Sequence, residues 1–327
     1  MNRVKYISSV FLRMLSLLIG VSIISFILVT NSPIDPLTSY IGAESTLSVE
    51  VKEEIADHWG LNDPPLERFA SWGKNVLKGD FGTSITYKQQ VSTVILERFK
   101  YSIVLMLVAW CFSGIVGFLI GVLAGIYKGG LFDKIIKIFC LALQSAPTFW
   151  IGLLILSLFS VYLGWFPIGF AVPMGKLSLE ITIWDRIYHL ILPALTLSIL
   201  GISRVTLFTR QKLIEILNSD FILFAKARGE NTRQLVIRHG LRNIALPAIT
   251  EQFASFSELF GGIALAETVF SYPGLGTATT AAGLNGDVPL LLGIAIFSAI
   301  FVFVGNFIAN ILYGVLDPRL KEGKYNG

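Results

Sequence analysis

The chain has 327 residues, of which 54% are hydrophobic and 15% charged, and its formal net charge is +4. Soluble domains carry about 25% charged residues, so this composition and several long apolar runs exclude an ordinary soluble domain and indicate a polytopic membrane protein. The net charge does not indicate a nucleic-acid partner. Cys111 and Cys140 lie inside apolar runs, and we expect them to be buried, unpaired side chains rather than disulfide partners or metal ligands.

The first 30 residues predict a membrane-spanning helix with a cytoplasmic amino terminus. An apolar run extends to about residue 29, and the basic residues near its start are Arg3, Lys5 and Arg13. A cleaved signal peptide begins in a similar way, but the run is followed by Asn31-Ser32-Pro33-Ile34-Asp35-Pro36 and not by a small-residue cleavage site. The span is therefore expected to be retained.

Residues 31–100 form a long polar region, which this orientation places outside the cytoplasm. Short helices are predicted over Ser48–Trp59 and Glu67–Leu77, followed by a turn at Gly79–Gly82. The region is either a structural cap on the membrane domain or a contact surface for an external partner. Composition favours the cap, because amphipathic helices most often only cover a surface.

The second and third spans are predicted over about Tyr101–Ile126 and Ile138–Leu163. The second carries glycines at spacings of three and four, which would let another helix approach closely, although Gly is also simply common in membrane helices. These glycines are Gly114, Gly117, Gly121 and Gly125. The third span contains Pro147, where we expect a kink.

Three further spans complete a predicted set of six, with both termini in the cytoplasm. The fourth begins near Ile187, and the fifth and sixth cover about Leu246–Leu265 and Pro289–Tyr313. Arg204 and Arg210 mark the cytoplasmic side of the fourth span. The predicted fold is thus an all-α polytopic membrane protein with six transmembrane helices, an external region after the first and a cytoplasmic helix between the fourth and fifth.

A polar, basic segment, Asp220–Thr250, interrupts the apolar sequence between the fourth and fifth spans. A helix-prone segment of this kind on the cytoplasmic side is a place where a membrane protein meets a soluble partner. Gly229 is expected to end a short helix in a left-handed conformation, and a cytoplasmic helix is predicted over about Leu217–Gln234.

The sequence lacks the signatures of an enzyme: it contains no GxxxxGK[ST], HExxH or CxxC pattern and no paired carboxylates. We therefore predict no catalytic, cofactor-binding or metal-binding residue. The histidines, His58, His189 and His239, show no ligand spacing. Glu251, Glu258 and Glu267 are acidic residues at the ends of the fifth span, where a functional role and a helix-pairing role are both open.

Ordered motifs along nearly the whole chain resemble ABC importer permeases, specifically the B-type subunit of the dipeptide, oligopeptide and nickel importer family. The cytoplasmic signature is Ala225-Lys226-Ala227-Arg228-Gly229, followed by Arg238-His239-Gly240-Leu241-Arg242-Asn243 and Leu246-Pro247. The other matching stretches are Trp59–Pro65, Gly79–Ser84, Pro147–Trp150, His189–Leu195, Glu267–Gly276 and Asp317–Arg319.

Two positions depart from the family pattern. Leu223 and Phe224 stand where the general signature has Glu-Ala, so only Ala225 of its Glu-Ala-Ala fits. Pro33-Ile34-Asp35-Pro36 replaces the Pro-Gly-Asp-Pro that often follows the first span. The first departure leaves open whether the contacts of that glutamate are made here.

The resemblance implies a transport subunit with no enzymatic activity, in which residues 1–30 are the first span, 31–100 the external region and 101–327 a five-helix core with a coupling segment at 210–246. It implies ATPase-coupling roles for Asp220, Ala225, Lys226, Ala227, Arg228, Gly229 and Glu230. It implies structural roles for His239, Arg242, Asn243, Pro247, Glu267, Pro273, Gly274, Gly276, Asp317, Pro318 and Arg319.

The implied assembly has a second permease, two cytoplasmic ATPases that bind ATP and Mg, and a periplasmic or lipid-anchored solute-binding protein, with no nucleic acid. The implied location is the cell (inner) membrane, and the implied substrates are peptides, nickel or metal chelates. An ion-driven secondary transporter is the first alternative, but intramembrane acids are scarce and we see no inverted repeat. A membrane-embedded enzyme is the second alternative, but the sequence lacks a paired set of catalytic groups at useful spacing.

Overall fold

The computed structural model describes residues 3–31, 63–177 and 179–316. Within these ranges the secondary structure is helical apart from one isolated bridge between Thr83 and Gln90, so the predicted all-α class is confirmed. The predicted helix Ser48–Trp59, His58 and the Asp317–Arg319 motif lie outside the described residues. Two compact units are distinguished, one formed by 1–102 with 273–304 and the other by 103–272 with 305–327.

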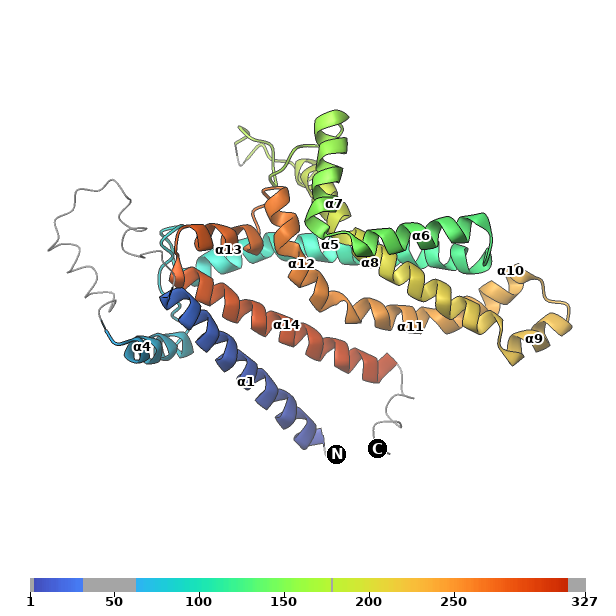
Figure 1. Cartoon of the computed structure of the whole chain (residues 1–327), viewed down its shortest axis with the longest axis horizontal. Helices are drawn as coiled ribbons and strands as arrows, with labels where there is room; N and C mark the ends of the chain where they lie inside the picture. Colours follow the sequence, from blue (N-terminus) through green and yellow to red (C-terminus); the bar gives the residue numbers. More distant parts are fainter. Residues whose placement is uncertain (1–2, 32–62, 178, 317–327) are drawn as a thin grey trace. The chain divides into compact units, whose positions relative to one another are not determined.

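The helices of Figure 1 have the following bounds. The first unit contains α1 (Arg3–Thr30), α4 (Pro65–Leu77), α13 (Leu275–Leu284) and the first parts of α5 (Val91–Ile126) and α14 (Val288–Leu316). The second contains the remainder of α5 and α14 and also α6 (Leu131–Ser145), α7 (Thr148–Ile155), η1 (Leu156–Tyr162), α8 (Ile183–Leu217), α9 (Asp220–Ala227), α10 (Thr232–Gln234), η2 (Leu235–Gly240), α11 (Leu241–Ala254) and α12 (Phe256–Val269).

Three helices within the described residues are long and apolar enough to cross a membrane: α5, α8 and α14. They correspond to the predicted second, fourth and sixth spans. The predicted first span is α1, whose described apolar part, Leu12–Ile27, is shorter, and the predicted fifth is divided between α11 and α12 at Ser255. The chain is thus a multi-pass membrane protein, and the count of six remains a prediction.

The predicted third span differs from expectation, because it is broken rather than kinked. Helices α6 and α7–η1 meet at an angle of 111°, and α7 turns away from the line of α6 in Figure 1. Ala146 and Pro147 at the break are extended, with ψ angles of 138° and 136°. Proline has no N–H to continue the helix, and the preceding residue is displaced from the helical region by the proline ring.

Helix α8 is the central element of the second unit and contacts α6, α7, α11, α12 and η2 (Figure 1). Three of the four glycines of the α5 stripe pack closely on α8, and the fourth, Gly114, packs on Gln252 of α11, so the predicted close approach of a helix is confirmed. A Cβ added at Gly117 would lie 2.9 Å from the Ile202 carbonyl oxygen, and one at Gly125 would lie 2.9 Å from the Leu213 side chain. Only glycine, whose side chain is a hydrogen atom, permits this approach. The Thr206 hydroxyl then donates a hydrogen bond to the Gly117 carbonyl oxygen (3.2 Å).

Polar contacts inside the second unit fix α5 and α6 to their neighbours. The Trp110 indole N–H donates to the Gln252 carbonyl (2.9 Å), and the buried Gln252 amide donates to the Trp110 carbonyl (2.6 Å). Asp133, at the start of α6, pairs with Arg210 of α8, with 2.7 Å between Oδ2 and Nη2. Such bonds fix the mutual position of helices that have little hydrophobic driving force between them in lipid.

Within the first unit, the predicted turn at Gly79–Gly82 is confirmed: both glycines have positive φ (84° and 81°), and the Asp80 side chain accepts from the Gly82 N–H (2.9 Å). The predicted helix over Glu67–Leu77 is also present, as α4. Asp287, fully buried before α14, accepts hydrogen bonds from the Ser84 hydroxyl (2.5 Å) and the Thr86 N–H (2.8 Å). This carboxylate therefore fixes the loop that follows the turn.

The two cysteines differ in their surroundings. Cys140 is buried, as expected, but Cys111 is exposed, so the expected burial of Cys111 is wrong. The physical reason is that an apolar side chain of a membrane protein can face lipid as readily as the protein interior.

Candidate functional site

The polar segment after α8 contains a short helix with a glycine turn at its end. Helix α9 has Asp220 in its first turn and Lys226 in its last, an arrangement that complements the helix dipole. Gly229 has a φ of +89°, its N–H donates to the Lys226 carbonyl (3.0 Å), and the Glu230 N–H donates to the Ala225 carbonyl (3.3 Å). The predicted left-handed glycine is confirmed, in the Schellman arrangement of a helix C-terminus.

The helix is shorter than expected. The prediction of a single helix over about Leu217–Gln234 is wrong, because the chain leaves the helical conformation between α9 and α10. The Asn231 side chain then caps α10: it accepts from the Gln234 N–H, and the Gln234 side chain accepts from the Asn231 N–H, both at 3.0 Å. This reciprocal capping box is a strong local helix-start signal, and it competes with helix continuation through the turn.

One side of α9 is anchored within this chain. Ile222 and Ala225 are buried with Leu235 of η2, and the partly buried Ile216 and Leu217 at the end of α8 pack against them. Ala225, for which the resemblance implies a coupling role, therefore lies in this internal cluster and not on the exposed side of α9. The cluster joins α9 to the end of α8, so movement of one helix would be transmitted to the other.

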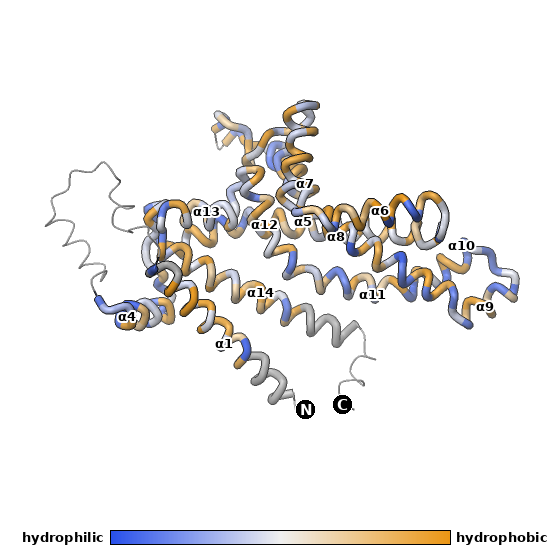
Figure 2. Tube along the Cα trace, viewed as in Figure 1, coloured by the Kyte–Doolittle hydropathy of each residue, from blue (hydrophilic) through white to orange (hydrophobic). Residues whose placement is uncertain are grey.

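The opposite side of α9 exposes large apolar side chains. Phe224 is 76% exposed and Leu223 is 57% exposed, and Phe221, at the edge of the anchored side with its ring 6.5 Å from that of His239, is 48% exposed. Figure 2 shows hydrophobic positions along α9 and hydrophilic positions in the turn and α10 that follow it. Exposed apolar side chains gathered within a polar segment indicate a protein contact. We name Phe221, Leu223 and Phe224 the α9 apolar surface.

The other residues with a predicted coupling role lie around the turn. Asp220, Lys226, Ala227, Arg228 and Gly229 are exposed, whereas Glu230 is partly buried. The Glu230 carboxylate lies 3.1 Å from the His239 Nε2, and the Asn243 side chain donates to the His239 carbonyl (2.7 Å). These contacts connect the turn to η2 and α11, so the family-motif residues His239 and Asn243 support the position of the turn.

The other predicted motif residues lie elsewhere. Arg242 and Pro247 are in α11, and Glu267 is fully buried in α12. Pro273, Gly274 and Gly276 belong to the other unit, where Gly274 immediately precedes α13. The structure thus brings Glu230, His239 and Asn243 together with α9. Glu258 and Glu251, whose roles the sequence left open, both pair with Arg204, and Glu251 lies 3.9 Å from it.

A family model described as "Binding-protein-dependent transport system inner membrane component" matches residues 117–322. The chain belongs to this family. It is therefore a transmembrane permease of an ABC importer, a transport component rather than an enzyme, and such permeases work in general with an ATPase and a substrate-binding protein. The match includes α9, the turn at Gly229 and the whole of α8.

Curated relatives align over nearly their full lengths. The oligopeptide transport system permease protein AppB of Bacillus subtilis is 35% identical over 95% of this chain and 97% of its own. The di/tripeptide transport system permease protein DppB of Pseudomonas aeruginosa is 32% identical, over 95% and 98% of the two chains. The dipeptide transport system permease protein DppB of Escherichia coli K12 is 30% identical, over 94% and 95%.

Sequence reasoning missed the α9 apolar surface. The sequence Asp220–Ala227 is apolar at nearly every central position, so periodicity alone does not separate the anchored side from the exposed side. The available signal was the departure from the general signature, which puts Leu223 and Phe224 where glutamate and alanine are usual.

Proposed function

We propose that this chain is one of two permease subunits of an ATP-driven importer of peptides, and that its α9 apolar surface docks on a cytoplasmic ATPase subunit. A second, homologous permease completes the translocation pathway, and a solute-binding protein delivers the substrate from outside. ATP and Mg are bound by two partner ATPases, and this chain binds no cofactor. Both of its termini lie in the cytoplasm, and the protein resides in the cell (inner) membrane.

The exposure of Phe224 is the observation that carries the ATPase contact. An aromatic side chain 76% exposed at the tip of a polar segment has the properties of an interface anchor, since such residues dominate binding energy when they enter a partner's pocket. The basic side chains of Lys226 and Arg228 at the end of α9 would form a polar rim around it. The apolar surface thus takes the place of the glutamate that this sequence lacks.

The coupling mechanism follows from how α9 is anchored. The cluster of Ile222, Ala225 and Leu235 joins α9 to the end of α8, and α8 is a single helix of 35 residues. When ATP binding closes the ATPase pair, a docked α9 would move with its ATPase and carry α8 with it. Rigid-body movement of this kind is a common route to alternating access.

Peptides are the proposed substrate, because the three relatives described above are named for oligopeptide, di/tripeptide and dipeptide transport. Nickel and metal chelates, carried by other members of the wider family, are the alternative substrates. The residues described in the structure contain no group of three or more His, Cys, Asp or Glu side chains able to hold a metal ion.

The test compares Phe224→Ser with a matched control, Leu284→Ser, in the complete importer reconstituted in liposomes. The two wild-type side chains are 76% and 78% exposed, but Leu284 ends α13, outside the coupling segment. We expect Phe224→Ser to weaken ATPase association by about 30-fold or more, because loss of a buried anchor typically costs about 2 kcal/mol or more. ATP-dependent peptide uptake should fall with it. Equal association and uptake in the two variants would exclude the proposed contact.

A further inference from the structure

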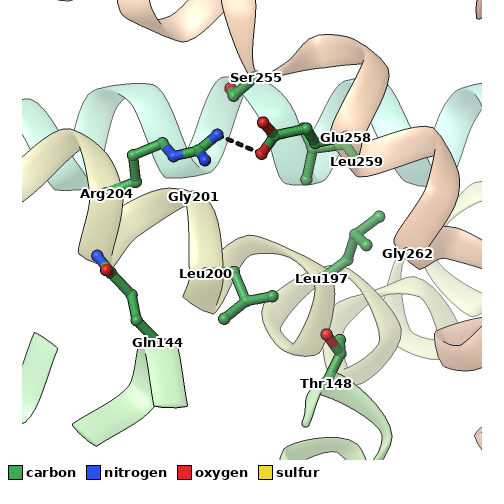
Figure 3. A pocket seen from close by; sticks show the side chains of 10 residues that line it. All are labelled: Gln144, Thr148, Leu197, Leu200, Gly201, Arg204, Ser255, Glu258, Leu259 and Gly262. Carbon is green, nitrogen blue, oxygen red and sulfur yellow. Dashed lines mark hydrogen bonds and ion pairs between the residues drawn. The ribbon is translucent and has the colours of Figure 1, made fainter. Parts of the chain in front are cut away.

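A pocket of about 260 Å³ lies within the second unit, among α6, α7, α8 and α12 (Figure 3). Its wall combines leucine side chains and glycine with polar groups. The polar lining residues are Gln144, Thr148, Arg204, Ser255 and Glu258. In Figure 3 the Arg204 guanidinium points towards the Glu258 carboxylate, and Leu197, Leu200 and Thr148 lie below them in this view.

The charged side chains at the pocket are accessible, and their charges do not sum to zero. Arg204 is paired with Glu258, and Glu251 lies 3.9 Å from its guanidinium. The side chains of Arg204, Glu258 and Glu251 are 41%, 64% and 29% exposed. One positive and two negative charges leave an excess carboxylate, and the more exposed of the two, that of Glu258, lines the pocket.

This cluster, whose arginine the charge pattern alone would put at the cytoplasmic side of the fourth span, lies at the level of an uncharged part of α5. Gly117 packs on Ile202 and Val205, the neighbours of Arg204 in α8. Gly117 is near the middle of residues 101–127, a stretch of α5 and the turn after it that contains no charged residue. Charged side chains at such a depth are costly unless they face a water-filled cavity, and they commonly mark the path of a transported substrate.

Broken backbone at the same place is a second, independent indication. Gln144 and Thr148 flank the break between α6 and α7, which meet at 111°. Non-helical backbone within a membrane is tolerated only where it is buried in protein or lines a water-filled cavity. Discontinuous helices are also where many transporters bind substrate. Ser255, which separates α11 from α12, lines the same pocket.

We propose that this pocket is a contact site for the free end of a peptide during its passage, a proposal that rests on the function proposed above. Glu258 accepts hydrogen bonds from the terminal ammonium group, and Arg204 donates to a carboxylate or carbonyl oxygen of the same peptide. A zwitterion fits both charges, whereas the Arg204 guanidinium disfavours a bare metal cation. Exchange of the Arg204–Glu258 ion pair for two contacts with the peptide leaves neither charge without a partner.

The experiment uses the complete importer in liposomes, with a mixture of dialanine, trialanine and tetra-alanine as the probe. The quantity measured is peptide molecules transported per ATP hydrolysed, in wild type, Glu258→Gln and Arg204→Gln. Lys176→Gln and Asp185→Asn are the controls, because this ion pair is 3.0 Å long, with side chains 42% and 18% exposed, and lies outside both the pocket and the coupling segment. We expect the ratio to fall about tenfold or more in the pocket variants, since hydrogen bonds to charged groups are strong, and to be unchanged in the controls.

If the Arg204–Glu258 ion pair served only to hold α8 against α12, this experiment would give a different result. The variant Arg204→Gln combined with Glu258→Gln removes both members of the pair, so neither is left without its partner if a single variant fails to assemble. A ratio equal to that of wild type in this double variant, or in either single variant, overturns the proposed contact. Absence of ATP-dependent uptake of every alanine peptide by the wild-type importer overturns the proposed function itself.

Discussion

Replacing Gly121 by alanine should destabilise the contact between α5 and α8. A Cβ at this position would lie 2.7 Å from the Thr206 carbonyl oxygen and 2.7 Å from the Thr209 Cβ. The first of these atoms belongs to the backbone of α8, so neither rotation of a side chain nor a small local shift relieves the clash. The helices must separate, which also weakens the bond between the Thr206 hydroxyl and the Gly117 carbonyl.

The change in the free energy of unfolding caused by Gly121→Ala is the sum of two opposing effects. Overpacking of a close contact costs about 1–3 kcal/mol, and replacing a helical glycine by alanine returns about 0.5–1 kcal/mol. Because the clash involves a backbone oxygen at 2.7 Å, the overpacking cost lies at the upper end of its range, and we expect the free energy of unfolding to fall by about 2 kcal/mol. Gly261→Ala in α12 is the matched control, because a Cβ there meets no atom within 4 Å, and it should raise the free energy of unfolding by about 0.5–1 kcal/mol.

The assay is an SDS titration of the purified protein in detergent micelles, followed by circular dichroism, with the two variants compared under identical conditions. The opposite signs expected for Gly121→Ala and Gly261→Ala make the comparison independent of the extrapolation to zero SDS. If Gly121→Ala is as stable as wild type or more stable, the close approach of α5 and α8 is refuted.

Three further predictions concern the coupling turn and two buried carboxylates. Gly229→Val should abolish substrate-stimulated ATPase activity without loss of membrane insertion, because a β-branched residue cannot adopt a φ of +89° without strain; normal stimulation would contradict this. Asp133→Asn should lower the free energy of unfolding by about 3–5 kcal/mol, measured by SDS titration, because Arg210 loses its buried partner, which is 4% exposed. The double variant Asp133→Leu with Arg210→Met should recover most of that loss, and no recovery would argue against the pair. Asp287→Ala should make the loop at residues 80–90 sensitive to protease, because Ser84 and Thr86 lose their acceptor; unchanged digestion kinetics would disprove the role of this carboxylate.

Local and periodic features were predictable because they depend on residues close together in the chain. Long uncharged stretches gave α5, α8 and α14, since a membrane span requires apolar length before any packing is considered. Gly229 was predicted to end a helix because only glycine adopts the required left-handed conformation at no cost. The glycine stripe of α5 followed from helical spacing alone, although its partner, α8, did not.

Only the tertiary structure decided which side of α9 is exposed, because that depends on where Leu235 packs, and it also decided that the chain breaks at Ala146–Pro147. It likewise paired Arg204 with Glu258, which is 54 residues away, and placed both at one pocket. The sequence by itself determined the helical membrane class, the positions of the longest spans and the turn at Gly229, because these follow from local backbone and solvation energies. Contacts between distant residues depend on the packing of whole helices, so no local pattern specifies them.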